Sequence, residues 1–257
     1  MARVFVTGSS DGLGFLAARL LIEQGHEITL HARNAARAEA TRRALPQAGA
    51  IVVGDVGSIA ETRRVAEQVN ALGRHDAVIH NVGIGARGAG RIESPDSLSL
   101  IFAVNVLAPY VLTALITRPD RLVYLSSGTH NGGAASLTDP QWTTRRWNGF
   151  QAYSDSKLFD VMLAFAVARH WPHVLSNAME PGWVATRMGG ANAPDDLSLG
   201  AVTQAWLAVS DDPAAKVTGQ YFFHQKIHPV NPVAQRTDLQ DMLLAYCADL
   251  TGVALPS

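Results

Sequence analysis

Short apolar segments alternate with helix-like segments along the whole 257-residue chain. The apolar segments are rich in β-branched and aromatic residues, as buried strands are, and most segments between them carry apolar residues at helical spacing. Strands joined in this way by helices pair in parallel, with the helices packed on both faces of the sheet. The sequence therefore predicts an α/β fold with a single doubly wound parallel sheet of the Rossmann type, whose roughly seven strands lie at residues 3–7, 27–31, 50–53, 76–80, 121–125, 175–179 and 220–223.

The helices expected between these strands span residues 13–23, 32–45, 58–72, 94–117, 151–170, 198–210 and 239–250. No internal repeat, low-complexity run or linker interrupts this alternation. We therefore expect one domain over residues 1–257.

The first strand leads into a glycine-rich turn, Gly8-Ser9-Ser10-Asp11-Gly12-Leu13-Gly14, which opens the first helix. Glycines allow the backbone to approach a pyrophosphate closely, and the free N–H groups of the helix favour an anion. The spacing Gly-x-x-x-Gly-x-Gly differs from the general dinucleotide fingerprint Gly-x-Gly-x-x-Gly. The candidate cofactor contacts in this turn are Gly8, Ser10, Asp11, Gly12, Leu13 and Gly14.

The end of the second strand bears on the choice between NAD and NADP. An NAD-binding fold usually places a carboxylate there for the ribose 2′-hydroxyl, whereas an arginine suits a 2′-phosphate. No carboxylate lies between His31 and Arg37. Arg33 is therefore the predicted phosphate contact and favours NADP over NAD; Arg37 is a second candidate, and a solvated surface arginine is the alternative.

Polar or small residues follow the third and fourth strands, at the edge where ligands bind in open parallel sheets. Asp55 is either an adenine contact or a turn-forming aspartate, and Val56 follows it. Asn81, Val82 and Gly83 suit a backbone packed against a ribose, or a plain loop. A buried Asn105 needs partners for its amide and would brace either the core or a water.

Tyr153 and Lys157 lie four residues apart, so a helix places both side chains on one face. A cation near a phenol favours the phenolate, which makes the pair a candidate acid and base. An ordinary packed helix pair is the alternative. Ser126 and Ser127 end the fifth strand and are candidates to meet the same ligand.

Two irregular segments, residues 128–150 and 183–197, are the candidate substrate loops. The aromatic side chains in them either wall an apolar substrate pocket or anchor the loops to the body. The candidate pocket residues are Trp142, Trp147, Phe150 and Trp183.

The charges are nearly balanced, with 21 Lys and Arg against 22 Asp and Glu. This balance argues against binding to nucleic acid or an anionic membrane and favours a small-molecule partner. The single cysteine, Cys247, agrees with a reducing compartment. A strand is expected to begin at residue 3, and the longest apolar run covers only residues 161–168. We therefore expect a cytoplasmic protein without a membrane span. No metal site is predicted.

The motifs occur in one order: Thr7-Gly8-x-x-x-Gly12-x-Gly14, Asp55, Asn81-x-Gly83, Asn105, Ser127, Tyr153-x-x-x-Lys157 and Pro181-Gly182. In this order they resemble the short-chain dehydrogenase/reductase family, which shows the same glycine spacing. Val82 stands where alanine is usual, and the stretch from Ser127 to Tyr153 is longer than usual. That longer stretch resembles the subset with retinol dehydrogenases and protochlorophyllide reductase-like proteins.

The resemblance implies an NADP-dependent oxidoreductase that interconverts a carbonyl and an alcohol, here a bulky apolar one. Tyr153 would be the general acid and base, Ser127 would hydrogen-bond the substrate oxygen, and Lys157 would lower the pKa of Tyr153 and hold the nicotinamide ribose. Asn105 would support a water chain to Lys157. Pro181, Gly182, Val184 and Thr186 would meet the nicotinamide.

Family members are often homodimers or homotetramers, so the resemblance also implies a homo-oligomer. The alternative to an enzyme is a noncatalytic dinucleotide-binding sensor or interaction protein on the same fold.

Overall fold

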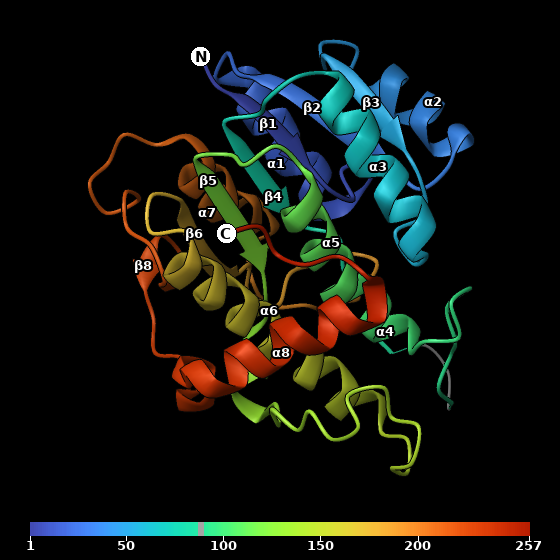
Figure 1. The fold of residues 1–257 in the computed structure, drawn as a ribbon. Helices are drawn as coiled ribbons and strands as arrows, with labels where there is room; N and C mark the ends of the chain where they lie inside the picture. Colours follow the sequence, from blue (N-terminus) through green and yellow to red (C-terminus); the bar gives the residue numbers. More distant parts are fainter. Residues whose placement is uncertain (87–89) are drawn as a thin grey trace.

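The computed structural model describes residues 1–86 and 90–257. An eight-stranded sheet with the order β3-β2-β1-β4-β5-β6-β7-β8 forms its centre (Figure 1). Strands β1 to β7 are parallel, and β8 pairs antiparallel with β7. The strands are β1 Arg3–Val6, β2 Glu27–Ala32, β3 Ala50–Val53, β4 Ala77–His80, β5 Arg121–Leu125, β6 Leu175–Glu180, β7 Tyr221–Phe223 and β8 Lys226–Ile227. The predicted doubly wound parallel sheet is confirmed, and β8 is an addition to it.

The order of the strands reverses between β1 and β4. The chain moves outward from β1 through β2 to β3 and then returns to the other side of β1 to form β4. At such a switch point the loops after the two neighbouring strands diverge and leave a crevice at the carboxyl ends of the strands. The glycine turn after β1 and the Asn81 loop after β4 border this crevice.

Helices cover both faces of the sheet (Figure 1). One apolar core joins the sheet to α3, α5, α6 and α8, and a second joins it to α1 and α7. The helices are α1 Gly12–Glu23, α2 Ala35–Ala44, α3 Ile59–Ala71, α4 Leu100–Phe102, α5 Ala108–Leu115, α6 Gly149–His170, α7 Leu197–Val209 and α8 Thr237–Thr251. A π-helical segment, η1 Ala103–Leu107, joins α4 to α5, and 3-10 turns lie at η2 Gly128–Gly132 and η3 Pro232–Gln235.

The prediction of one helix over residues 94–117 is wrong at its start. Helix α4 begins only at Leu100, because Ser97 has a left-handed backbone with φ of 60° and the Ser94 hydroxyl accepts hydrogen bonds from the amides of Asp96 and Leu98. The Asp96 carboxylate instead accepts the backbone N–H of Ile59 at 2.8 Å and so caps α3. Ser58, which directly precedes that helix, makes no side-chain cap bond.

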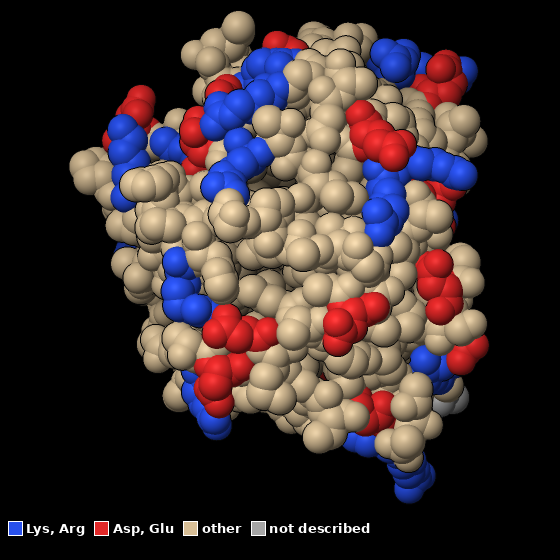
Figure 2. All heavy atoms as spheres, viewed as in Figure 1, with Lys and Arg blue, Asp and Glu red and all other residues tan. Residues whose placement is uncertain are grey.

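Both signs of charge are interspersed on the face shown in Figure 2. This distribution agrees with the small formal net charge of −1. Within residues 1–86 and 90–257, no helix combines the length and apolar character needed to cross a bilayer.

Candidate active site

The glycine turn after β1 is shaped by two left-handed glycines. Gly8 and Gly12 have φ of 62° and 58°, a backbone conformation that a side chain would strain. A Cβ on Gly12 would meet no protein atom within 4 Å, so the start of α1 faces open space. Gly14 has a different role, since a Cβ there would lie 2.7 Å from the carbonyl oxygen of Gly8 and would also collide with Asn81. The turn therefore packs closely behind α1 and exposes the helix N-terminus in front, a cradle that fits a pyrophosphate.

A buried histidine ties this turn to the neighbouring strands. The Gly8 N–H donates to His31 Nδ1 at 3.0 Å, so Nδ1 is unprotonated and Nε2 donates to the carbonyl of Gly54 at 2.9 Å. Burial lowers the pKa of His31, although the Gly54 carbonyl opposes that shift. His31 is thus neutral and positions the ends of β1, β2 and β3 around the crevice. The sequence analysis assigned it no role.

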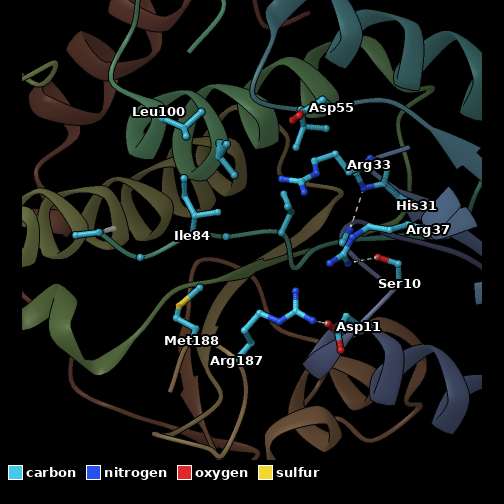
Figure 3. Close-up of a pocket in the computed structure, with 17 residues that line it drawn as sticks. Ser10, Asp11, His31, Arg33, Arg37, Asp55, Ile84, Leu100, Arg187 and Met188 are labelled. Atoms are coloured by element: carbon cyan, nitrogen blue, oxygen red, sulfur yellow. Dashed lines mark hydrogen bonds and ion pairs between the residues drawn. The ribbon is translucent and has the colours of Figure 1, made fainter. Parts of the chain in front are cut away.

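A cavity of about 600 Å³ extends from the glycine turn across the ends of β2 and β3. Figure 3 shows Arg33, Arg37 and Arg187 directed toward it from separate segments. Arg37 Nη1 donates to the Ser10 hydroxyl at 3.3 Å, and Arg187 pairs with the Asp11 carboxylate at 3.2 Å. Three guanidinium groups around one cavity make it suited to a polyanionic ligand.

Asp55 lines the same cavity and forms a turn, and its contact with an adenine stays a prediction. Its Oδ1 accepts the Gly57 N–H at 3.0 Å, which makes it a turn-forming residue, while its side chain remains exposed at the cavity. Val56, Val82 and Gly83 also line the cavity.

A smaller cavity of about 230 Å³ adjoins the first and contains Tyr153 and Lys157. Helix α6 carries both residues, and the Lys157 ammonium lies 5.9 Å from the centre of the Tyr153 ring. Gly8, Asp11, Val82, Gly83, Arg187 and Met188 line both cavities. The predicted acid-base pair therefore opens onto the same crevice as the glycine turn.

Lys157 is almost completely buried, and two partners hold it. Its ammonium donates to the carbonyl of Leu125 at 2.8 Å and to Oδ2 of Asp160 at 2.7 Å. Burial lowers the pKa of Lys157, but the Asp160 carboxylate, together with Tyr153, opposes that shift and the pKa is raised overall. Burial raises the pKa of Asp160 to about 6, against the pull of the ammonium. Asp160 was not predicted from the sequence, although its i, i+3 spacing from Lys157 could have indicated the pair.

The two serines after β5 differ in their bonding. The buried Ser126 hydroxyl donates to the carbonyl of Lys157 at 2.7 Å and so supports helix α6. The partly exposed Ser127 accepts only a weak bond of 3.3 Å from the Thr129 N–H. The hydroxyl proton of Ser127 is therefore free to bond another acceptor. Of the two serines, however, only Ser126 lines the smaller cavity.

Two asparagines have structural partners. Asn105, in the π-helical segment, accepts the Ile84 N–H at 2.8 Å and donates to the Ile84 carbonyl at 3.0 Å and to Ser156 at 2.9 Å. Asn81 donates to the carbonyl of Thr7 at 2.8 Å. The Asn105 amide thus holds the loop after β4 against the protein core. This agrees with the expectation that Asn105 braces the core.

The segment after β6 contributes to the lining of the crevice. Gly182 has φ of 82°, and the Asp195 carboxylate accepts the Trp183 N–H at 2.5 Å. Pro181 and Thr186 line the smaller cavity, whereas Gly182 and the buried Val184 support the segment without lining it. This segment also delivers Arg187 and Met188, which the sequence analysis did not single out.

The loop over residues 128–150 is organised by carboxylates. Asp139 accepts the backbone N–H groups of Thr143, Thr144 and Arg145 at 2.8 to 3.0 Å, which hold its pKa well below the usual range despite its burial. Asp155 on α6 accepts the Ala134 N–H at 2.8 Å.

The aromatic residues of this loop divide into anchors and exposed groups. Trp142 is 7% exposed, packs edge-on against Trp147 and carries the Arg145 guanidinium 3.7 Å above its ring. Trp142 and Trp147 thus anchor the loop, and the further expectation that Trp142 walls a substrate pocket stays a prediction. Phe150 and Trp183 are exposed.

The family model for short chain dehydrogenases matches residues 2–196 of the chain. The match contains the glycine turn, Asn81, Asn105, both serines, and Tyr153 with Lys157. The chain belongs to the short-chain dehydrogenase family. The resemblance inferred from the motifs is thereby confirmed.

Individual members of the short-chain dehydrogenase family agree with this assignment. An uncharacterized oxidoreductase of Emericella nidulans is 44% identical over 260 residues, which cover 100% of this chain and 99% of the relative. Retinol dehydrogenase 13 of Homo sapiens is 28% identical over 99% of this chain and 86% of the relative, in line with the expected resemblance to that subset. A solved structure of an uncharacterized protein from Mycobacterium paratuberculosis superposes with a TM-score of 0.85 at 26% identity, covering 100% of this chain and 96% of that one.

Proposed function

We propose that this short-chain dehydrogenase is an NADP-dependent enzyme that interconverts a carbonyl compound and an alcohol, with Tyr153 as the general acid and base. The observation that carries the proposal is that Tyr153, Lys157 and the glycine turn all line one crevice. A dinucleotide that begins at the turn would extend toward Tyr153 along the residues that line both cavities.

The residues fit such a cofactor. The open space before α1 and its free N–H groups suit the pyrophosphate, and Asp55 and Val56 suit the adenosine. Lys157 and Thr186 lie where they would hold the nicotinamide end. When bound, the nicotinamide supplies or accepts the hydride, and the protein supplies orientation and proton transfer.

The proton transfer follows from the positions of two hydroxyl groups. In reduction the Tyr153 hydroxyl gives its proton to the carbonyl oxygen, and in oxidation it accepts the proton of the alcohol. Ser127 donates a hydrogen bond to the same oxygen, because its hydroxyl donates to no other acceptor within the described residues. Ser126 is committed to the Lys157 carbonyl and cannot take this part.

The preference for NADP rests on Arg33 and Arg37. Both guanidiniums line the larger cavity, and Arg37 reaches the Ser10 hydroxyl of the glycine turn. A 2′-phosphate would provide the anion that such a pair binds, whereas a ribose hydroxyl would leave both charges without a counterion.

The substrate we propose is a bulky apolar aldehyde, ketone or alcohol. Met188 is 52% exposed, Trp183 62% and Phe150 69%, and all three come from the two candidate substrate loops or their edges. Met188 approaches Gly85 beside the larger cavity, and Gly149, next to Phe150, lies against Ala86. The similarity to a retinol dehydrogenase supports the same substrate class.

Replacing Tyr153 with Phe tests the catalytic assignment. We expect kcat/KM for NADPH-dependent reduction of all-trans-retinal or aromatic ketones to fall at least about 100-fold, because the variant lacks the transferable proton. NADPH affinity, measured by calorimetry, should stay within about threefold. Tyr246→Phe removes a phenol hydroxyl from α8, outside the residues that line either cavity, and is the matched control.

Near wild-type turnover by Tyr153→Phe would refute the assignment. A wild-type protein that binds NADPH but turns over no carbonyl or alcohol in the panel would favour the noncatalytic sensor instead. The cytoplasmic location and the homo-oligomer stay predictions from the sequence.

A further inference from the structure

We propose that Asp160 is a positioning residue whose buried carboxylate keeps the Lys157 ammonium charged and directed at the active-site crevice. The inference rests on the proposed function only for its catalytic consequence, because the ion pair itself is a feature of the folded chain. Asp160 lies one helical turn after Lys157 on α6, and Nζ to Oδ2 is 2.7 Å. The two side chains are 5% and 4% exposed.

A lysine in this position needs a counterion. Removing an ammonium from water favours its neutral form, and buried lysines lose their charge near neutral pH unless an anion compensates. Asp160 is the carboxylate that forms an ion pair with Lys157 in the described part of the chain. A neutral Lys157 would have no positive charge with which to act on Tyr153 or on ribose hydroxyls.

The carboxylate also determines the direction of the ammonium. An ammonium has three N–H donors, and the Leu125 carbonyl and Asp160 take two of them. The nitrogen lies beside Gly83, where a Cβ would come within 3.3 Å of it, and Gly83 lines both cavities. The remaining N–H is therefore available on the crevice side, toward Tyr153.

The groups packed around Asp160 leave Lys157 as its counterion. Tyr124 from β5 lies close enough for Asp160 to affect it, and burial holds the pKa of Tyr124 well above the usual range. Its hydroxyl bonds Thr113 of α5 at 2.7 Å, which in turn bonds His80 of β4 at 3.0 Å. Burial lowers the pKa of His80 to about 3, so this chain of groups is neutral at ordinary pH.

The chain offers a direct measurement because it contains three lysines, Lys157, Lys216 and Lys226. Selective 13C labelling of lysine gives three side-chain NMR signals, and Lys157→Met identifies the one of interest. Lys216 and Lys226 are on the surface and serve as internal references. The titration needs neither cofactor nor substrate, so it stands even if the proposed function fails.

Asp160→Asn keeps the size and an acceptor oxygen of the side chain but removes its charge. We expect the Lys157 signal of the wild type to titrate above the usual range of a lysine, and that of the variant to titrate at least one pH unit lower than in the wild type. A Lys157 signal that titrates identically in both proteins would overturn the proposal. Asp160→Glu, which retains the charge, should restore at least half of the shift.

The catalytic consequence is a pH-dependent loss. In Asp160→Asn, kcat/KM for carbonyl reduction should fall more at pH 9 than at pH 7, relative to wild type, and the extra loss should match the fraction of Lys157 that the NMR titration shows to be deprotonated at pH 9. Asp155→Asn removes another buried carboxylate from α6, one that contacts the loop over residues 128–150, and should lower the melting temperature without this pH dependence. A thermal melt of each variant identifies any loss of folding. If Asp160→Asn lowers activity equally at both pH values, a purely structural role is indicated and the proposal is wrong.

Discussion

Two ion pairs border the proposed cofactor crevice, and they differ mainly in their access to water. Lys157 and Asp160 lie behind it, with side chains 5% and 4% exposed. Arg187 and Asp11 lie across its mouth, with side chains 76% and 55% exposed. Both pairs join a cation to a carboxylate at close range, 2.7 Å and 3.2 Å respectively.

The difference in burial implies different roles. Separating a buried pair leaves a charge in a medium that solvates it poorly, so Lys157 and Asp160 form a fixed part of the site. An exposed pair contributes at most about 1 kcal/mol, because water and salt solvate its members well. Arg187 can therefore exchange Asp11 for a ligand phosphate at little cost, whereas Lys157 cannot leave Asp160.

The largest expected effect comes from breaking the buried pair. Lys157→Leu leaves Asp160 without its counterion, and the free energy of unfolding at neutral pH should fall by roughly 3 to 5 kcal/mol. The double variant Lys157→Leu/Asp160→Leu should recover most of this loss, since no charge is then buried alone. Urea unfolding followed by tryptophan fluorescence measures both. A loss below about 1 kcal/mol in the single variant would mean that the buried pair contributes no more to stability than an exposed pair does.

An intermediate effect is expected at the exposed end, where the proposed ligand and not the protein supplies the anion. Arg33→Ala should raise the Kd for NADPH at least tenfold, in line with the roughly 1.5 to 3 kcal/mol of a hydrogen bond to a charged group. The Kd for NADH should change less than about twofold, because NADH lacks the 2′-phosphate. Calorimetric titration with each cofactor measures the ratio.

Arg42→Ala is the control for this comparison, because Arg42 is an exposed arginine of α2, the helix that follows Arg33, and does not line the larger cavity. If Arg33→Ala weakens the binding of NADPH and of NADH equally, Arg33 does not bind the 2′-phosphate. Selective weakening by Arg37→Ala alone would assign that role to Arg37, which already reaches Ser10.

The smallest effect is expected from breaking the exposed pair. Arg187→Gln should raise the Kd for NADPH and the Kd for NADH by the same factor, below about fivefold. The reason is that Asp11, the partner of Arg187, is at the start of α1, where the pyrophosphate common to both cofactors would bind. The loss should shrink further in 0.5 M NaCl, which screens exposed charges. Stronger weakening of NADPH than of NADH would show that Arg187 meets the 2′-phosphate instead.

Local patterns predicted much of this molecule. The strand limits at Ala50–Val53 and Arg121–Leu125 agree with the expectation, and the others differ by one residue, because short β-branched runs are recognisable without knowledge of their neighbours. The closeness of Tyr153 and Lys157 followed from helical spacing alone. Helix α4 was predicted to start too early. Hydrophobic periodicity does not reveal the left-handed backbone of Ser97 or the hydrogen bonds of the Ser94 hydroxyl, which delay the start of the helix.

The fold class, the glycine turn and the closeness of Tyr153 to Lys157 were predictable from the sequence, since each depends on residues within a few positions of one another. Only the tertiary structure brought Arg187 to Asp11, 176 positions apart by their numbering, and buried His31 against Gly8 and Gly54. It also decided that Trp142 anchors a loop and that Lys157 is withdrawn from water, which is what makes Asp160 important. Burial and long-range contact depend on how the whole chain packs, and no local pattern encodes them.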